Sequence, residues 1–283
     1  MSKLIAIDSG HGIETPGKRT PAIPENWYGK KKGEVIHEKE FNKSTAEYLI
    51  KALERNGFKT INVSPGTKDI SLKERYASAN NAKADLYISI HYNASTGKWG
   101  SANGIETIVS QYASARSKEL ANFVQQELVE SLGRRNRGVK TDIEQSGINL
   151  AVLRNTNMPA ILTESGFMDN LEEAKTMLDP VFQKSAAEAM CRGICKYFNV
   201  AYKDDFKMPA ENITRSSSRE DIKWLQEKLN KVVQGYPLKV DGIYSAKVRI
   251  AVLMYWDLRG WNQDGKDTGW TAGSGTREAL AKV

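Results

Sequence analysis

Short apolar runs alternate with amphipathic segments over the first two hundred residues of the chain. The apolar runs, which are bounded by turn residues as buried strands are, cover 4–7, 60–63, 86–90, 104–109 and 159–163. Apolar residues at helical spacing occupy 41–55, 71–82, 115–132 and 181–198. Strands that alternate with helices predict an α/β fold with a mostly parallel, twisted sheet flanked by helices.

The pattern changes after about residue 200, where a polar stretch that contains Arg215-Ser216-Ser217-Ser218 reads as a linker. Beyond it, Ile222, Leu225 and Leu229 have helical spacing, and a second helix is expected over 248–256. A chain of 283 residues has room for two domains. We therefore expect a first domain over 1–200, a linker over 201–214 and a small, mainly helical domain over 215–283.

Composition places the chain among ordinary globular proteins, with 40% hydrophobic and 27% charged residues. No segment reaches the ~18 consecutive apolar residues of a membrane span, so membrane insertion is not expected. The apolar run that follows Met1 is shorter than a secretory signal of roughly 7–15 apolar residues. We therefore expect synthesis in the cytoplasm without an export signal. Cys191 and Cys195 lie four residues apart in a predicted helix, a spacing typical of buried thiols and not of a disulfide.

The formal net charge of +7 would suit a polyanionic partner. Basic residues are interspersed with acids, however, and the densest clusters, 30–32 and 134–137, fall in predicted loops without a nucleic-acid-binding motif. We expect no nucleic-acid partner. An anionic polymer such as a bacterial cell wall fits the charge equally well.

Polar residues follow three of the predicted strands at the point where each strand ends. His11 comes after the first strand, His91 after the third, and Glu164 after the strand over 159–163. Ligands of open α/β sheets bind beyond the carboxyl ends of the strands, and two imidazoles with a carboxylate are typical of catalytic zinc. Histidines at strand ends are also common as hydrogen-bonded loop residues. The residues by themselves leave both a metal hydrolase and a site-free loop open.

The order of motifs along 3–199 resembles that of the zinc-dependent N-acetylmuramoyl-L-alanine amidases of the amidase-3 family. Six segments carry the resemblance, namely Ile7-Asp8-Ser9-Gly10-His11-Gly12, Glu38-Lys39-Glu40-Phe41-Asn42, Ser89-Ile90-His91-Tyr92-Asn93-Ala94, Arg137-Gly138-Val139-Lys140, Val152-Leu153-Arg154 and 158–167 with Asn170. Each motif is weak alone, and their shared order makes the resemblance specific.

The resemblance implies that His11, Glu38 and His91 bind a zinc ion and that Glu164 is the catalytic carboxylate. Two imidazole nitrogens and one carboxylate leave a fourth position for water, as catalytic zinc requires. Glu38 lies 27 positions after His11, which is longer than the usual family spacing.

Neighbouring residues compete for some of these roles. The choice of Glu38 over Glu34 and Glu40 rests on the E-K-x-x-N motif, which ends at Asn42. His37 is interpreted as a solvated loop residue. Arg154 and Asn93 are candidates for orienting the substrate.

The C-terminal domain resembles small three-helix peptidoglycan-binding domains. The motif residues are Leu225-Gln226-Glu227-Lys228-Leu229-Asn230, Val240-Asp241-Gly242-Ile243-Tyr244, and Asp264-Gly265 with Gly275-Thr276. Ser245 stands where the family has glycine, so the first repeat departs from the pattern. We expect Trp224 and Trp256 to fill the core of this domain, and its partner to be peptidoglycan.

The expected function is hydrolysis of the amide between N-acetylmuramic acid and L-alanine in bacterial peptidoglycan, which leads to lysis of the wall. A zinc peptidase that cuts within the stem peptide and a non-catalytic wall-binding protein are the alternatives. A wall amidase without an export signal resembles a phage endolysin released through a holin lesion or an autolysin released by mother-cell lysis. The target species, the peptidoglycan subtype and the oligomeric state stay open.

Overall fold

The computed structural model describes residues 2–204, 208–261 and 268–282. The chain divides into two compact units, Met1–Asp204 and Asp205–Val283. In the described ranges, no helix has both the length and the apolar character needed to cross a bilayer.

The first unit is built on one six-stranded sheet with the order β2-β1-β3-β6-β4-β5. Its strands are β1 (Leu4–Ser9), β2 (Lys59–Asn62), β3 (Leu86–Asn93), β4 (Ile105–Val109), β5 (Asn136–Thr141) and β6 (Ala160–Phe167). Neighbouring strands are parallel except for β4 and β6, which are antiparallel. The predicted α/β fold with a mostly parallel sheet is thus confirmed.

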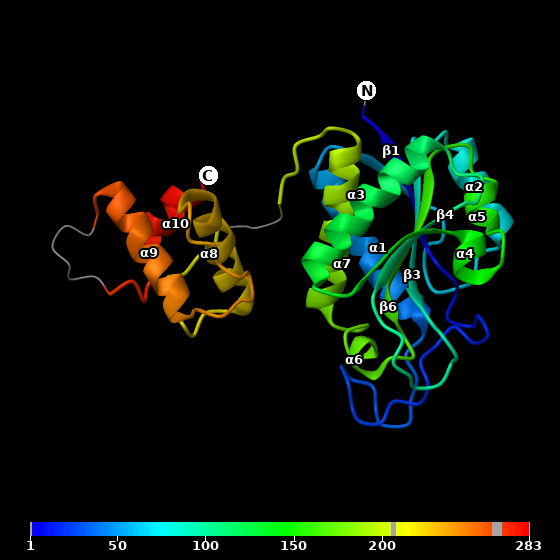
Figure 1. Cartoon of the computed structure of the whole chain (residues 1–283), viewed down its shortest axis with the longest axis horizontal. Coiled ribbons are helices and arrows are strands. Elements are labelled where there is room, and N and C mark those ends of the chain that lie inside the picture. The colour runs from blue at the N-terminus through cyan, green and yellow to red at the C-terminus, as the bar shows by residue number, and fades with distance from the viewer. Residues whose placement is uncertain (1, 205–207, 262–267, 283) are drawn as a thin grey trace. The chain divides into compact units, whose positions relative to one another are not determined.

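Helices cover both faces of the sheet (Figure 1). The larger layer contains α1 (Glu38–Arg55), α3 (Ala115–Leu132) and α7 (Pro180–Tyr197). The opposite layer contains α2 (Leu72–Asn81), α4 (Asp142–Ser146) and α5 (Ala151–Arg154), and α6 (Leu171–Ala174) follows β6. The face under α2 and α5 carries the polar residues described below.

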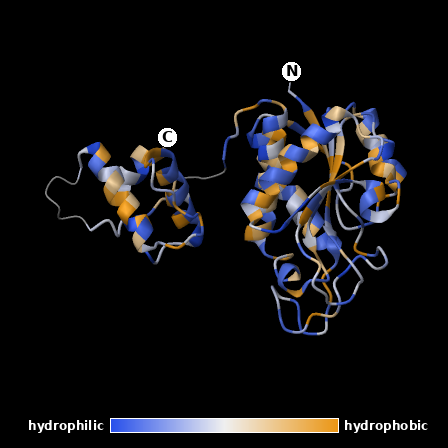
Figure 2. Ribbon diagram, in the orientation of Figure 1, coloured by the Kyte–Doolittle hydropathy of each residue, from blue (hydrophilic) through white to orange (hydrophobic). Residues whose placement is uncertain are grey.

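Alternation along the strands divides the core between the two helical layers, because successive side chains of a strand point to opposite faces. Ile5 and Ile7 pack in the larger apolar cluster with α1 and α7, whereas Ala6 packs with α2 and α5. Figure 2 shows apolar colour along the central strands, between helices of mixed colour. Cys191 and Cys195 are free, buried thiols in α7.

Helices α3 and α7 approach closely at Gly193. A Cβ atom placed at this glycine would lie 2.7 Å from the Cα atom of Val124. No side chain fits at that separation, so the missing side chain of Gly193 lets the two helices pack.

The structure differs from the sequence-based expectation at three places in the first unit. Helix α1 begins at Glu38 and not near Phe41. Asn136 and Arg137, which we assigned to a loop, belong to the edge strand β5. The short helices α4, α5 and α6 were not predicted.

The second unit contains three described helices, α8 (Arg219–Val232), α9 (Ala246–Arg259) and α10 (Ser274–Leu280). Their shared core includes Trp224 and Trp256, which are 1% and 7% exposed, as expected for core residues. Ile213 is fully buried and pairs with Ala272, so the packed core of this unit includes a residue of the range that we assigned to the linker. The motif residues Asp264 and Gly265 lie outside the described residues.

Two of the motifs in the second unit contact each other. The Gln226 side chain donates to Oδ1 of Asp241 and accepts from the backbone N–H of Gly242. Asn230 exchanges two hydrogen bonds with the backbone of Leu238. The helix α8 motif therefore holds the turn that follows it.

Candidate active site

Two imidazoles and one carboxylate meet at the carboxyl edge of the sheet. His11 lies on the turn after β1, Glu38 is the first residue of α1, and His91 lies near the end of β3. One potential ligand atom from each lies within 4.8 Å of the others, and among the described residues these three form the group able to hold a metal. His11 Nε2 is 3.4 Å from Glu38 Oε2, and His91 Nδ1 is 3.0 Å from Glu38 Oε1.

The turn that carries His11 brings its ring against that of His91. The two ring centroids are 4.8 Å apart with the planes at 87°. A Cβ atom at Gly10 would lie 2.1 Å from the His91 ring, so glycine is required at this position. His11 itself has a φ of 61°, a left-handed conformation that costs about 1–3 kcal/mol in a residue with a side chain. The local backbone therefore accepts strain to place this imidazole.

Glu38 is 1% exposed and held by hydrogen bonds. Its Oε1 atom accepts from the backbone N–H of Tyr92 at 3.1 Å and from Asn42 Nδ2 at 3.3 Å. Burial would raise the pKa of Glu38, but the attraction of His11, whose imidazole is charged at acid pH, and the close approach of His91 outweigh it and lower the pKa to about 2. The carboxylate is ionised at neutral pH.

His11 is neutral under the same conditions. Burial is the largest influence on its imidazole and, against the attraction of Glu38, lowers the pKa of His11 to about 4. Neutral imidazole and ionised carboxylate are the protonation states that bind divalent metals.

A chain of hydrogen bonds fixes the tautomer of His91. The Ser89 hydroxyl donates its single proton to Oδ2 of Asp8 at 2.7 Å and lies 3.0 Å from His91 Nε2. Ser89 must then accept the Nε2–H of His91, which leaves Nδ1 facing Glu38. At 3.0 Å from a carboxylate oxygen, Nδ1 needs either a proton or a cation between the two atoms. Metal-binding histidines usually have such a partner on the second ring nitrogen.

Glu164 lies beside this group on β6, directly opposite His91 in the parallel pairing of β3 and β6. Its side chain is 9% exposed, and its Oε2 atom has no hydrogen-bond partner among the described residues. Burial and the nearby Glu38 carboxylate raise the pKa of Glu164 well above its ordinary value. Buried polar atoms normally have a hydrogen-bond partner, so an unpartnered carboxylate oxygen here is best explained by a role in transferring a proton during the reaction.

The competing acids near Glu38 lie elsewhere. Glu34 is exposed, whereas Glu40 accepts from the backbone N–H of His37 and pairs with Lys30. His37 is the half-buried N-cap residue that directly precedes α1. Neither Glu40 nor His37 belongs to the metal-ligand group.

The two candidates for orienting the substrate differ in their surroundings. Arg154 is exposed at the end of α5, where it donates to the backbone carbonyl of Asn149. Asn93 is buried and donates to Oε1 of Glu106 at 2.7 Å. The structure thus adds Glu106, which the sequence analysis did not identify although it is a charged residue within an apolar strand.

A scan against protein-family models matches residues 5–196 to the amidase-3 family, described as N-acetylmuramoyl-L-alanine amidase. Among curated relatives, the amidase LytC of Bacillus subtilis is 33% identical over 199 residues, or 70% of this chain and 36% of LytC. An endolysin of Bacillus phage SPP1 is 31% identical over 225 residues, or 77% of this chain and 74% of the endolysin.

Solved structures of N-acetylmuramoyl-L-alanine amidases also resemble this chain. The N-acetylmuramoyl-L-alanine amidase of Clostridium difficile 630 superposes with a TM-score of 0.60 at 32% identity. The superposition covers 70% of this chain and 97% of that one. The family match over residues 5–196 lies within the first unit.

Proposed function

We propose a zinc-dependent mechanism for this chain, which belongs to the amidase-3 family of N-acetylmuramoyl-L-alanine amidases. The chain is an enzyme of that class, and its substrate is bacterial peptidoglycan. The scissile bond joins the lactyl carboxyl group of N-acetylmuramic acid to the amino group of L-alanine. What we propose is how the residues at the sheet edge perform this hydrolysis.

The observation that carries the proposal is the convergence of His11, Glu38 and His91 from three separate segments. Two nitrogens and one oxygen are the donor set of catalytic zinc sites with an open position. The close approach of His91 Nδ1 to Glu38 Oε1 fits a shared cation. A zinc ion bound there would supply a water that ionises near neutral pH and would polarise the substrate carbonyl.

Glu164 is assigned the proton transfers. Its Oε2 atom would accept a proton from the attacking water and then donate it to the alanine nitrogen as the amide breaks. Without that proton the leaving group would be an amine anion, which is too basic to depart. A raised pKa makes Glu164 a stronger base than an ordinary glutamate. Its place opposite His91, outside the ligand group, suits a residue that serves the water without binding the metal.

Product analysis separates this function from its alternatives. Purified peptidoglycan is digested and the fragments are analysed by mass spectrometry and N-terminal labelling. The amidase produces new free lactyl carboxyl groups and new L-alanine N-termini. New N-termini at later stem residues would indicate a zinc peptidase, and no new termini would indicate a wall-binding protein.

Metal removal tests the zinc assignment in the same assay. Chelation should abolish the release of fragments, and stoichiometric zinc should restore it. The unit should stay folded by circular dichroism, because a ~200-residue α/β domain has enough core without the metal. Full activity in protein shown to be metal-free by elemental analysis would refute the assignment.

The second unit is assigned to wall binding. Support comes from its three described helices and from the contacts between its two motifs at Gln226, Asp241 and Asn230. The fragment 215–283 should sediment with purified peptidoglycan and hydrolyse nothing. Because Ile213 belongs to the core of this unit, a fragment that begins at 208 is the better-folded comparison.

A further inference from the structure

A buried carboxylate next to Glu164 is bound by two cations. Glu106 of β4 lies directly opposite Glu164 in the antiparallel pairing of β4 and β6. Residues paired in this way share one face of the sheet, so His91, Glu164 and Glu106 form a row across three strands. Glu106 Oε2 accepts from Arg137 Nε at 2.7 Å and from Lys140 Nζ at 2.6 Å.

A β-bulge brings both cations to this face. Arg137 and Lys140 are three residues apart in β5, so a regular strand would point them to opposite faces. The pairing shifts register between β4 and β5, where Glu106 faces two residues, Arg137 and Gly138. Gly138 has a φ of 82°, which favours glycine, and its backbone N–H donates to Asn136 Oδ1. Bulges of this kind re-aim side chains beside active sites.

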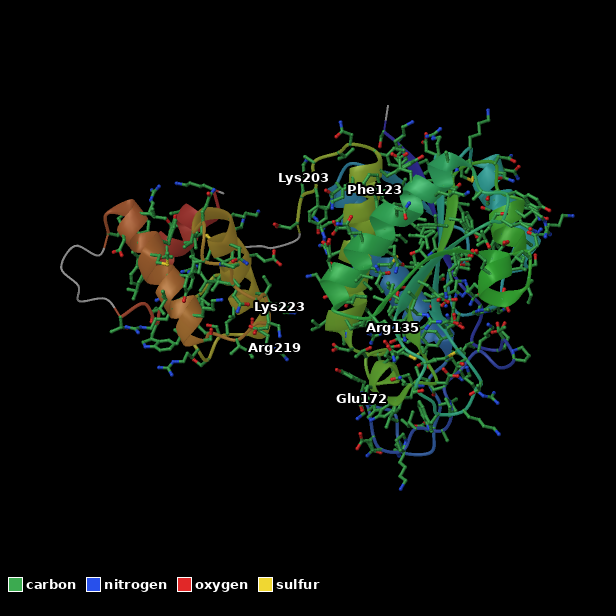
Figure 3. All side chains as sticks on the ribbon, viewed as in Figure 1. Phe123, Arg135, Glu172, Lys203, Arg219 and Lys223 are labelled. Carbon is green, nitrogen blue, oxygen red and sulfur yellow. The ribbon has the colours of Figure 1, made fainter. Side chains whose placement is uncertain are left out.

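Arg137 and Lys140 together carry more positive charge than is needed to neutralise the Glu106 carboxylate. Glu106 is 2% exposed and also accepts from Asn93 Nδ2, so a single cation would neutralise it. The side chains of Arg137 and Lys140 remain 25% and 29% exposed. Arg137 also donates from Nη1 to the backbone carbonyl of Asn103 at 3.4 Å, and both it and Lys140 still carry further N–H donors. Together with Glu106, Arg137 and Lys140 carry a net charge of +1 beside the catalytic row, near the end of the sheet where Arg135 precedes β5 (Figure 3).

We propose that Arg137 and Lys140 bind a carboxylate of the peptidoglycan stem peptide and make the enzyme prefer substrates in which that carboxylate is free. The inference rests on the proposed function of the same site. The residue after L-alanine in the stem is D-glutamate joined through its γ-carboxyl group, so its α-carboxyl group is either free or amidated. A free carboxylate accepts charge-assisted hydrogen bonds from both cations, whereas a carboxamide is neutral and brings an N–H₂ donor.

The test compares two muropeptides that differ at this group alone. They are N-acetylmuramoyl-L-alanyl-γ-D-glutamyl-L-lysine and its α-carboxamide form. The zinc-loaded wild type should cleave the acid with a kcat/KM about tenfold higher than its kcat/KM for the amide. This is the lower end of the effect expected for a charge-assisted hydrogen bond, because both cations are partly exposed. In Arg137→Gln and in Lys140→Met the ratio of the two kcat/KM values should fall to near one.

The chain offers a matched control in Glu127, which also binds an arginine and a lysine. Glu127 lies 2.7 Å from Arg192 Nε and 2.6 Å from Lys196 Nζ, on helices remote from the catalytic row. Lys196→Met removes the same charge from the protein, so it controls for long-range attraction of the acid. Its acid-to-amide ratio should match that of the wild type.

Binding gives a second readout that does not need turnover. Titration calorimetry of both uncleaved muropeptides with Glu164→Gln should give the same tenfold preference in Kd, and Arg137→Gln in that background should remove it. Equal kcat/KM for acid and amide in the wild type together with equal Kd in Glu164→Gln would overturn the inference, as would a preference that survives both Arg137→Gln and Lys140→Met. Failure to cleave either muropeptide would instead contradict the proposed function, and the Kd ratio would still decide the carboxylate site.

Discussion

The replacement Asp8→Asn tests the hydrogen-bond chain behind His91. Asp8 is 1% exposed at the end of β1, where Oδ1 accepts from Arg75 Nη1 at 2.8 Å. Its other oxygen accepts from the Ser89 hydroxyl, which in turn holds His91. Asparagine keeps the shape, but it removes the negative charge and replaces one acceptor oxygen with a donor. The guanidinium of Arg75, itself 2% exposed, would lose its buried counter-charge.

The magnitude follows from burial. Breaking one partner of a buried ion pair typically costs about 3–5 kcal/mol. Arg75 keeps a second partner in Asp69 at 2.7 Å, so we expect a loss of about 3 kcal/mol in the free energy of unfolding, at the lower end of that range. For a unit of this size, such a loss lowers the melting temperature by roughly 6–12 °C.

Asp85→Asn is the matched control. Asp85 pairs with Lys3 at 2.8 Å, but the two side chains are 32% and 49% exposed. An exposed pair is worth about 0–1 kcal/mol, so this variant should melt within about 4 °C of wild type. Differential scanning calorimetry of the full chain resolves the comparison. Equal shifts in the two variants would refute the reasoning from burial.

The pH dependence of the Asp8 effect has a definite sign. Burial would raise the pKa of Asp8, but Arg75 and the hydroxyl donors outweigh it and leave the pKa below 3.8. A depressed pKa stabilises the fold fully above the unfolded value and loses that contribution as pH falls through the folded value. The difference in the free energy of unfolding between wild type and Asp8→Asn should therefore be constant near neutral pH and narrow below about pH 3.8.

Asp8→Asn should also weaken zinc binding by about 10–100-fold through Ser89 and His91, as measured by competition with a chelating indicator.

Three further outcomes follow from the site and the packing. Alanine at His11, Glu38 or His91 should remove bound zinc and activity together, as measured by elemental analysis and fragment release. Truncation after Ala201 should leave cleavage of small muropeptides intact but lower the rate on intact wall, by up to about 10²–10⁴-fold if the second unit binds the wall; an unchanged rate on wall would assign that unit another role, such as dimerisation. Gly193→Ala should cost about 1–3 kcal/mol in denaturant unfolding, because its methyl group would overlap α3.

The predictable part of the fold is the part with strong periodicity. The buried strands β1, β3 and β6 are nearly continuous apolar runs, and the helices α3 and α7 carry clear caps at Ser114 and Asp179. Strand β5 was not predicted because it is a half-exposed edge strand. Its bulge at Gly138 also breaks the apolar–polar alternation by which a strand is identified in a sequence. The antiparallel direction of β4 depends on tertiary pairing, which local sequence does not encode.

The residues of the candidate site were likewise predictable where a motif marks them. His11, His91 and Glu164 were identified at the ends of predicted strands and Glu38 from the E-K-x-x-N motif. His11, Glu38 and His91 lie in one potential ligand group, with Glu164 beside it. Glu106 was missed because its significance lies in its register opposite Glu164, which is fixed only when β4 and β6 pair.

Glu164→Gln tests the central claim most directly when zinc content and turnover are measured on the same sample. The account predicts one bound zinc per chain with wild-type affinity and a kcat reduced by roughly 10²–10⁴-fold, because the amide cannot accept the proton of the attacking water. Loss of zinc from Glu164→Gln, together with retention of zinc by Glu38→Ala, would contradict it by exchanging the roles of the two carboxylates.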